Sequence, residues 1–132
     1  MKQRLVFLVE DNLDNILLTE LGVREANCDF NSRASGRYLF QWVDENPGQA
    51  PDLILLDIQL PREDGYAVLK QIRAHPSLTN TRVVAVTADI HQFERCRTEG
   101  FDGFIGKPLK PHLFPGQIQC ILDGDSVWER GI

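Results

Sequence analysis

Five polar side chains follow short apolar runs in this sequence, and together they have the chemistry to bind and accept a phosphoryl group. They are Glu10, Asp11, Asp57, Thr87 and Lys107. Three carboxylates brought together repel one another, so burying them requires a compensating cation. Lys107 supplies one positive charge. Mg²⁺ is the natural second cation because it prefers oxygen ligands and keeps some of its waters.

With such an ion bound, the site would attract a phosphoryl group. Asp57 would then act as the nucleophile and form an acyl phosphate, while Thr87 and Lys107 would hold the remaining phosphoryl oxygens. Each residue alone also has an ordinary structural explanation, such as a helix cap for the acidic pair or a turn for the aspartate. Joint placement at four separate strand ends favours a site, because open parallel sheets bind ligands there.

The elements that position these residues follow from the hydrophobic pattern. Nearly continuous apolar runs at residues 5–9, 52–57 and 83–86 predict strands that are covered on both faces. Residues 28–34 alternate and predict an edge strand, and residues 103–106 predict a fifth strand.

Helical spacing lies between these runs. It predicts a first helix after Asn12 as cap, a second after Ser35, a third from 65 to 75, a fourth from 89 to 99 and a fifth from about 111–114 to 122. Strand and helix thus alternate five times, which predicts an α/β fold with a parallel sheet and helices on both faces.

The composition narrows the function classes. The 132 residues fit one domain, and the formal net charge of −5, without any basic run, argues against a nucleic-acid partner. The apolar stretch near the N-terminus is too short for a signal peptide or a membrane span, so we expect a cytoplasmic protein without a membrane partner. Cys28, Cys96 and Cys120 are widely spaced, which predicts free thiols rather than disulfides or a zinc site.

The residues at the strand ends resemble those of the receiver domain of two-component response regulators. The resemblance covers residues from about 4 to 122. Its matching stretches are Val9-Glu10-Asp11-Asn12, Leu55-Leu56-Asp57-Ile58-Gln59-Leu60-Pro61, Asp64-Gly65, Val86-Thr87-Ala88 and Gly106-Lys107-Pro108.

This resemblance implies a five-stranded, doubly wound, flavodoxin-like (CheY-like) sheet with strand order 2-1-3-4-5. It also implies that a histidine kinase or a histidine phosphotransfer protein phosphorylates Asp57. Glu10, Asp11, Asp57 and the backbone carbonyl of Gln59 would hold Mg²⁺. Such a domain is a signalling switch rather than an enzyme, and its own chemistry is limited to Mg²⁺-dependent self-phosphorylation from a phosphodonor and autodephosphorylation.

The resemblance also assigns a switch. Thr87 would move toward the phosphoryl group and Phe104 would turn inward. Both changes would remodel the face of the fourth helix, fifth strand and fifth helix for partner binding or for a homodimer. A plain core aromatic is the alternative for Phe104. Gln59 and Asp89 occupy positions that tune phosphoryl lifetime in the family, although exposed loop residues would look the same in sequence.

Residues 1–123 are therefore expected to form the receiver domain, and 124–132 a short polar tail. Phe93 and Phe114 are candidate contact residues, with burial in the core as the alternative.

We expect a stand-alone receiver with an unidentified downstream protein target, but a receiver belonging to a larger regulator or hybrid kinase is also compatible. An aspartate-nucleophile phosphohydrolase is disfavoured because Gln59 stands where such enzymes need a second aspartate. A phosphorylation-independent interaction module is disfavoured by the complete set of site residues.

Overall fold

A single parallel sheet organises the computed structural model, which describes residues 3–131. Within that range the sheet has six strands in the order β2-β1-β3-β4-β5-β6, and every neighbouring pair is parallel. The strands are β1 (Leu5–Val9), β2 (Asp29–Arg33), β3 (Leu53–Asp57), β4 (Arg82–Thr87), β5 (Gly103–Gly106) and β6 (Trp128–Glu129). The first five confirm the flavodoxin-like order that the resemblance implied.

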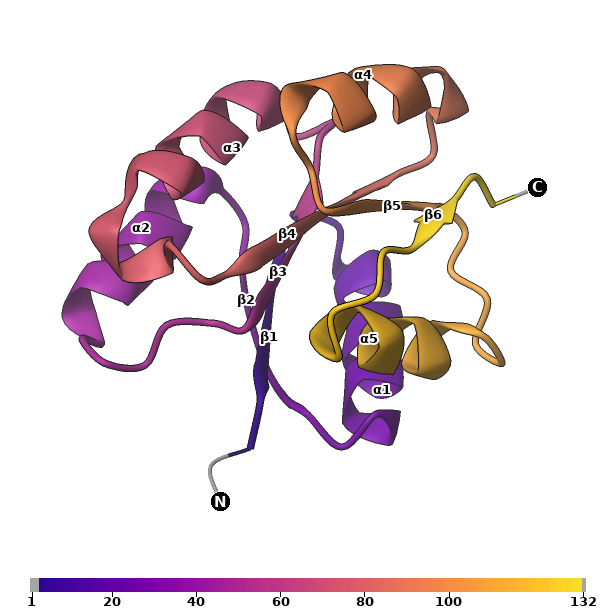
Figure 1. Cartoon of the computed structure of the whole chain (residues 1–132), viewed down its shortest axis with the longest axis horizontal. Helices are drawn as coiled ribbons and strands as arrows, with labels where there is room; N and C mark the ends of the chain where they lie inside the picture. The colour runs from indigo at the N-terminus through magenta and orange to yellow at the C-terminus, as the bar shows by residue number, and fades with distance from the viewer. Residues whose placement is uncertain (1–2, 132) are drawn as a thin grey trace.

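Helices cover both faces of the sheet. The α-helices are α1 (Leu13–Glu25), α2 (Gly36–Glu45), α3 (Gly65–Ala74), α4 (Phe93–Glu99) and α5 (Phe114–Leu122), and two short 3₁₀ turns are η1 (Pro76–Leu78) and η2 (Ile90–Gln92). Figure 1 shows α1 and α5 on one face and α2, α3 and α4 on the other. The predicted alternation of strands and helices is therefore confirmed.

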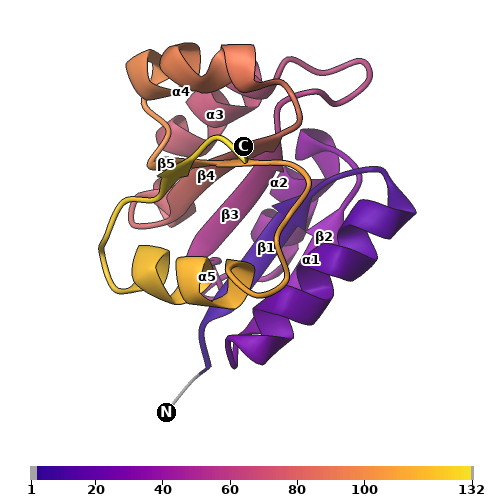
Figure 2. The same cartoon turned by 90° about the vertical axis from the view of Figure 1, so that its right-hand side faces the viewer.

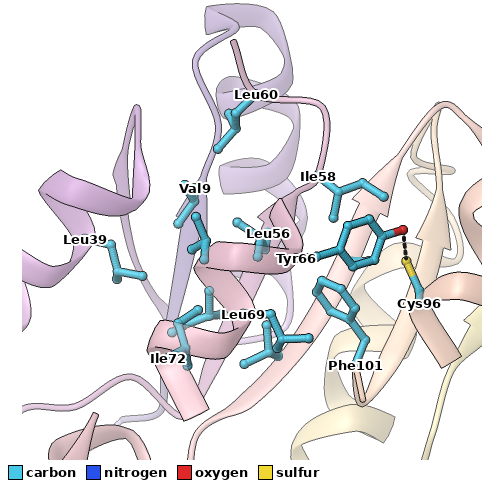
Figure 3. Close-up of a cluster of buried hydrophobic side chains, with 14 of the residues drawn as sticks. Val9, Leu39, Leu56, Ile58, Leu60, Tyr66, Leu69, Ile72, Cys96 and Phe101 are labelled. Carbon is cyan, nitrogen blue, oxygen red and sulfur yellow. Dashed lines mark hydrogen bonds between the residues drawn. The ribbon is translucent and has the colours of Figure 1, made fainter. Parts of the chain in front are cut away.

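The strands are buried on both faces, which explains their continuous hydrophobicity. Side chains of β1 alternate between the two sides: Phe7 and Val9 join the cluster under α2, α3 and α4, whereas Val6 and Leu8 join the cluster under α1 and α5. Figure 3 shows part of the first cluster, where side chains of the sheet meet those of α2 and α3.

Helix starts follow the predicted caps. The Asn12 side chain accepts a hydrogen bond from the Asn15 amide at 3.0 Å, and the Ser35 hydroxyl accepts one from the Tyr38 amide at 3.3 Å. The predicted fourth helix differs in its first turn, because residues 90–92 form η2 and the α-helical part begins at Phe93. Phe93 and Phe114 are both buried, as the core alternative predicted.

The largest difference from the sequence expectation lies after α5. Residues 128 and 129, expected within a polar tail, form β6 and extend the sheet beyond β5 (Figure 2). Their register pairs Phe104 with Trp128 and Ile105 with Glu129. A two-residue strand has no periodicity of its own, so the sequence pattern could not predict it.

Candidate functional site

The register of the sheet brings the predicted site residues to one edge. Asp57 is the last residue of β3 and Thr87 the last of β4, while Glu10 follows β1 directly and Lys107 follows β5. The Lys107 amide donates to the Thr87 carbonyl at 2.8 Å, which ties the ends of β4 and β5 together. Because all strands are parallel, their carboxyl ends share one edge, between the two layers of helices.

Lys107 joins two of the acidic side chains. Its ammonium group lies 2.6 Å from Glu10 Oε1 and 3.2 Å from Asp57 Oδ2. Glu10 and Asp57 are both buried, at 2% and 6% exposure. Their other carboxylate oxygens accept backbone hydrogen bonds, Asp57 Oδ1 from the Gln59 amide at 2.9 Å and Glu10 Oε2 from the Asp11 amide at 3.0 Å. These bonds fix the orientation of both carboxylates.

Asp11 completes an acidic cluster. Glu10, Asp11 and Asp57 each offer a carboxylate oxygen, and these oxygens all lie within 4.8 Å of one another. Lys107 supplies one positive charge against three negative ones, so the cluster retains an excess of negative charge. An all-oxygen donor set with excess negative charge fits a hard divalent cation such as Mg²⁺. The predicted convergence of these three carboxylates opposite Lys107 is therefore present.

Thr87 and Gln59 form a second contact at the site. The buried Thr87 hydroxyl donates to Gln59 Oε1 at 3.0 Å and accepts from the Asp89 amide at 3.2 Å. The Asp89 side chain in turn accepts from the His91 amide at 3.0 Å and so caps η2. The sequence placed these residues near the site, but their hydrogen bonds could not be predicted from a pattern.

Phe104 lies in β5 and is fully buried. Its ring meets the Phe93 ring edge-on, with centroids 5.1 Å apart. The Phe104 ring faces the core in this structure. Its turn between an outward and an inward position on phosphorylation stays a prediction.

Tyr66 of α3 and Cys96 of α4 form a polar contact inside the core. The Tyr66 hydroxyl donates to Gln92 Oε1 at 2.6 Å. It also lies 3.6 Å from Cys96 Sγ, the contact that Figure 3 shows. Burial raises the pKa of the Cys96 thiol, and it raises the pKa of the Tyr66 hydroxyl as well, with the Cys96 contact adding to the shift. Both groups are therefore neutral near pH 7.

Comparison with known proteins assigns the family. The family model for the response regulator receiver domain matches residues 6–119 of this chain. The chain belongs to the response regulator receiver domain family. Receiver domains of this family are components of two-component signalling systems, and the chain has the fold of solved receiver domains. Within residues 3–131, no helix combines the length and the apolar character needed to cross a bilayer.

Individual relatives come from both free-standing and multidomain proteins. The polar-differentiation response regulator DivK of Brucella ovis is 33% identical over 123 residues, which cover 92% of this chain and 97% of DivK. The hybrid signal transduction histidine kinase L of Dictyostelium discoideum is 33% identical over 110 residues, which cover 80% of this chain and only 6% of the kinase.

Among solved structures, the receiver domain of sensor histidine kinase PA1611 from Pseudomonas aeruginosa has a magnesium ion coordinated in its active-site cleft. It is 29% identical to this chain, with a TM-score of 0.75, and the match covers 92% of this chain and 96% of that domain.

Proposed function

We propose that this receiver domain accepts a phosphoryl group on Asp57 from a phosphohistidine of a histidine kinase or a histidine phosphotransfer protein. The observation that carries the proposal is the contact of one lysine with two buried carboxylates, beside a third, at the carboxyl ends of the strands. Apart from the nucleophile itself, phosphoryl transfer requires positioning and charge neutralisation, and this cluster offers both.

The transfer replaces one bond to phosphorus by another. An oxygen of the Asp57 carboxylate attacks phosphorus, the bond from phosphorus to the donor's imidazole nitrogen breaks, and that nitrogen keeps the electron pair. Lys107 then holds a phosphoryl oxygen in place of its contact with Asp57 Oδ2. The Thr87 hydroxyl leaves Gln59 and donates to a second phosphoryl oxygen. Hydrolysis by water later restores the carboxylate and releases inorganic phosphate.

Glu10, Asp11 and Asp57, with the backbone carbonyl of Gln59, would hold Mg²⁺ in this site. When bound, the ion supplies positive charge that offsets the negative charge of the carboxylates and the phosphoryl group. The donor set and the excess of negative charge around Lys107 support this assignment, as does the magnesium ion of the PA1611 receiver domain.

An aspartate-nucleophile phosphohydrolase is the competing function, and the position of Gln59 argues against it. A carboxamide does not exchange protons as a general acid or base must. Its oxygen also accepts the hydrogen bond of Thr87, so the side chain is already engaged. We therefore propose that turnover is limited to self-phosphorylation from a phosphodonor and slow autodephosphorylation.

The exposed leucines of α1 are the proposed contact for the phosphodonor. Leu13, Leu17 and Leu21 are 67%, 56% and 62% exposed, and their spacing of four residues places them on one side of α1. An apolar stripe on a surface helix indicates a protein contact. This stripe begins two residues after Asp11, so a donor protein that lies against α1 would bring its phosphohistidine close to the site. A cytoplasmic location and a homodimer through α4, β5 and α5 remain predictions.

Mass spectrometry of the intact protein tests the phosphoacceptor assignment. We expect acetyl phosphate with Mg²⁺ to add one phosphoryl group to the wild type, and we expect chelation of Mg²⁺ to reduce the adduct strongly. Asp57→Asn removes the nucleophile but keeps the shape of the side chain, so it should gain no adduct. Equal labelling of wild type and Asp57→Asn would overturn the assignment. A steady release of phosphate from many donor molecules at an enzyme's rate would favour the phosphohydrolase.

A further inference from the structure

The segment of residues 127–131, here called the strap, lies along the edge of β5 and against α4. In Figure 2 it runs beside β5 next to the end of the described chain. The Phe104 amide donates to the Val127 carbonyl at 2.8 Å, so the strap takes a hydrogen bond that an open edge of β5 would leave to water. The strap therefore covers part of the α4, β5 and α5 face that the resemblance assigns to partner contacts.

Two glycines of β5 make room for the strap. A side-chain carbon at Gly103 would lie 2.6 Å from the Val127 carbonyl oxygen, and one at Gly106 would collide with the Arg130 carbonyl oxygen. Any larger residue at either position would push the strap away from β5. The strand β5 is therefore shaped to receive another backbone at close range.

Side chains of α4 pack against the strap. The Trp128 ring meets the Phe93 ring edge-on, with centroids 5.7 Å apart, and the Arg97 guanidinium lies 5.1 Å from the centre of the Trp128 ring. The Arg130 guanidinium lies 4.4 Å from the centre of the Phe93 ring. Aromatic pairs and cation–π contacts of this kind stabilise docking beyond the buried area. The ion pair of Arg130 with Glu94 is exposed and 3.8 Å long, so it adds little.

A chain of contacts joins the strap to the phosphoacceptor site. The Thr87 hydroxyl accepts a hydrogen bond from the Asp89 amide, and the Asp89 side chain caps η2. The turn η2 leads directly into Phe93 at the start of α4. If Thr87 turns toward a phosphoryl group, the hydrogen bond to Asp89 is lost and the start of α4 is free to shift. Phe93 contacts both Phe104 and Trp128, so that shift acts directly on the strap.

From these contacts we infer that the strap is an intramolecular ligand of the β5–α4 face, docked in the unphosphorylated chain and released by phosphorylation of Asp57. The inference rests on the proposed phosphoacceptor function. The docked strap blocks this face, and its release opens the edge of β5 and the Phe93 surface for binding.

Amide hydrogen exchange measured by NMR tests the docked state without any phosphodonor. We expect the Phe104 amide to be protected in the wild type and in Ser126→Ala, an exposed control position next to the strap. Trp128→Ala removes the ring contacts with Phe93 and Arg97, so exchange at Phe104 should become about tenfold faster. The amides of β3 should keep their protection and report that the fold is intact. Equal exchange in wild type and Trp128→Ala would overturn the docking.

The release is tested in the same way with acetyl phosphate and Mg²⁺, while intact mass follows phosphorylation in each sample. We expect exchange at Phe104 to accelerate by about tenfold in phosphorylated wild type and to stay unchanged in Asp57→Asn. An adduct with unchanged exchange would overturn the release but leave the phosphoacceptor assignment standing. Absence of any adduct would overturn the phosphoacceptor assignment, and the release would fall with it, whereas the docking would still be judged from the unphosphorylated samples.

Discussion

Replacing Lys107 tests the charge balance of the site most sharply. In Lys107→Met the aliphatic length is kept, but Glu10 and Asp57 lose the cation that lies 2.6 Å and 3.2 Å from their oxygens. At an effective dielectric constant of about 20, these contacts correspond to about 6 and about 5 kcal/mol of attraction before the cost of desolvation. Both carboxylates stay buried and then repel each other and Asp11.

The net loss is much smaller than this attraction, because the wild type also bears the cost of burying the lysine. Removing one partner of a buried ion pair typically costs about 3–5 kcal/mol. The Lys107 side chain is 16% exposed, which favours the lower end, about 3 kcal/mol. For a domain of this size, that loss lowers the urea midpoint by roughly 2 M.

Urea unfolding in the presence of a chelator measures this loss, with Lys70→Met as the control. Lys70 lies exposed on α3, so its replacement should change the free energy of unfolding by less than about 0.5 kcal/mol. Addition of Mg²⁺ should recover more stability in Lys107→Met than in the wild type, because the variant site carries one more uncompensated negative charge. A loss below about 1 kcal/mol, the range of a surface ion pair, would refute the picture of a buried charge cluster.

Three further predictions concern other parts of the molecule. Gln59→Ala removes the contact with Thr87, and Asp89→Ala removes the cap of η2. Asp57 should still be phosphorylated in both variants, but the hydrolysis rate of the acyl phosphate, followed by intact mass, should change several-fold, and unchanged decay in both would contradict the contact network. Leu17→Glu should slow phosphotransfer from a cognate phosphorylated donor domain at least about tenfold while labelling by acetyl phosphate stays at the wild-type rate, and equal slowing of both would rule out a docking role. Burial raises the pKa of the Cys96 thiol, so at pH 8 iodoacetamide should modify exposed Cys120 and spare Cys96 in the folded chain, and rapid alkylation of Cys96 would contradict its burial. Because the thiol ionises more readily in the unfolded chain, the free energy of unfolding should also fall as the pH rises above the ordinary thiol pKa of 9.0.

The sequence predicted the site because strand ends in a parallel sheet are fixed by simple rules. Apolar runs located the first, third and fourth strands, and the residues after them had to meet at one edge. The convergence of Glu10 and Asp57 follows from that geometry, and Lys107 joins them because residues 103–106 also form a parallel strand of the sheet. Individual hydrogen bonds, such as that from Thr87 to Gln59, depend on rotamers and loop conformations that no pattern encodes.

Two features escaped prediction for physical reasons. Spacing predicted α1, but it did not show that Leu13 and Leu21 face solvent, because periodicity identifies an apolar stripe without naming what covers it. The strand β6 depends on backbone pairing with β5 and on Trp128 packing against Phe93. Both are long-range contacts, and two residues are too few to carry a strand pattern.

The most direct test of the central claim is to locate the phosphoryl group on the chain. Borohydride reduces an acyl phosphate of aspartate to homoserine, and tandem mass spectrometry of the digested protein then identifies the modified residue. After treatment with acetyl phosphate and Mg²⁺, we predict homoserine at position 57 alone, in an amount that matches the intact-mass adduct. Modification of Glu10, Asp11 or a carboxylate elsewhere, with Asp57 left intact, would contradict the account.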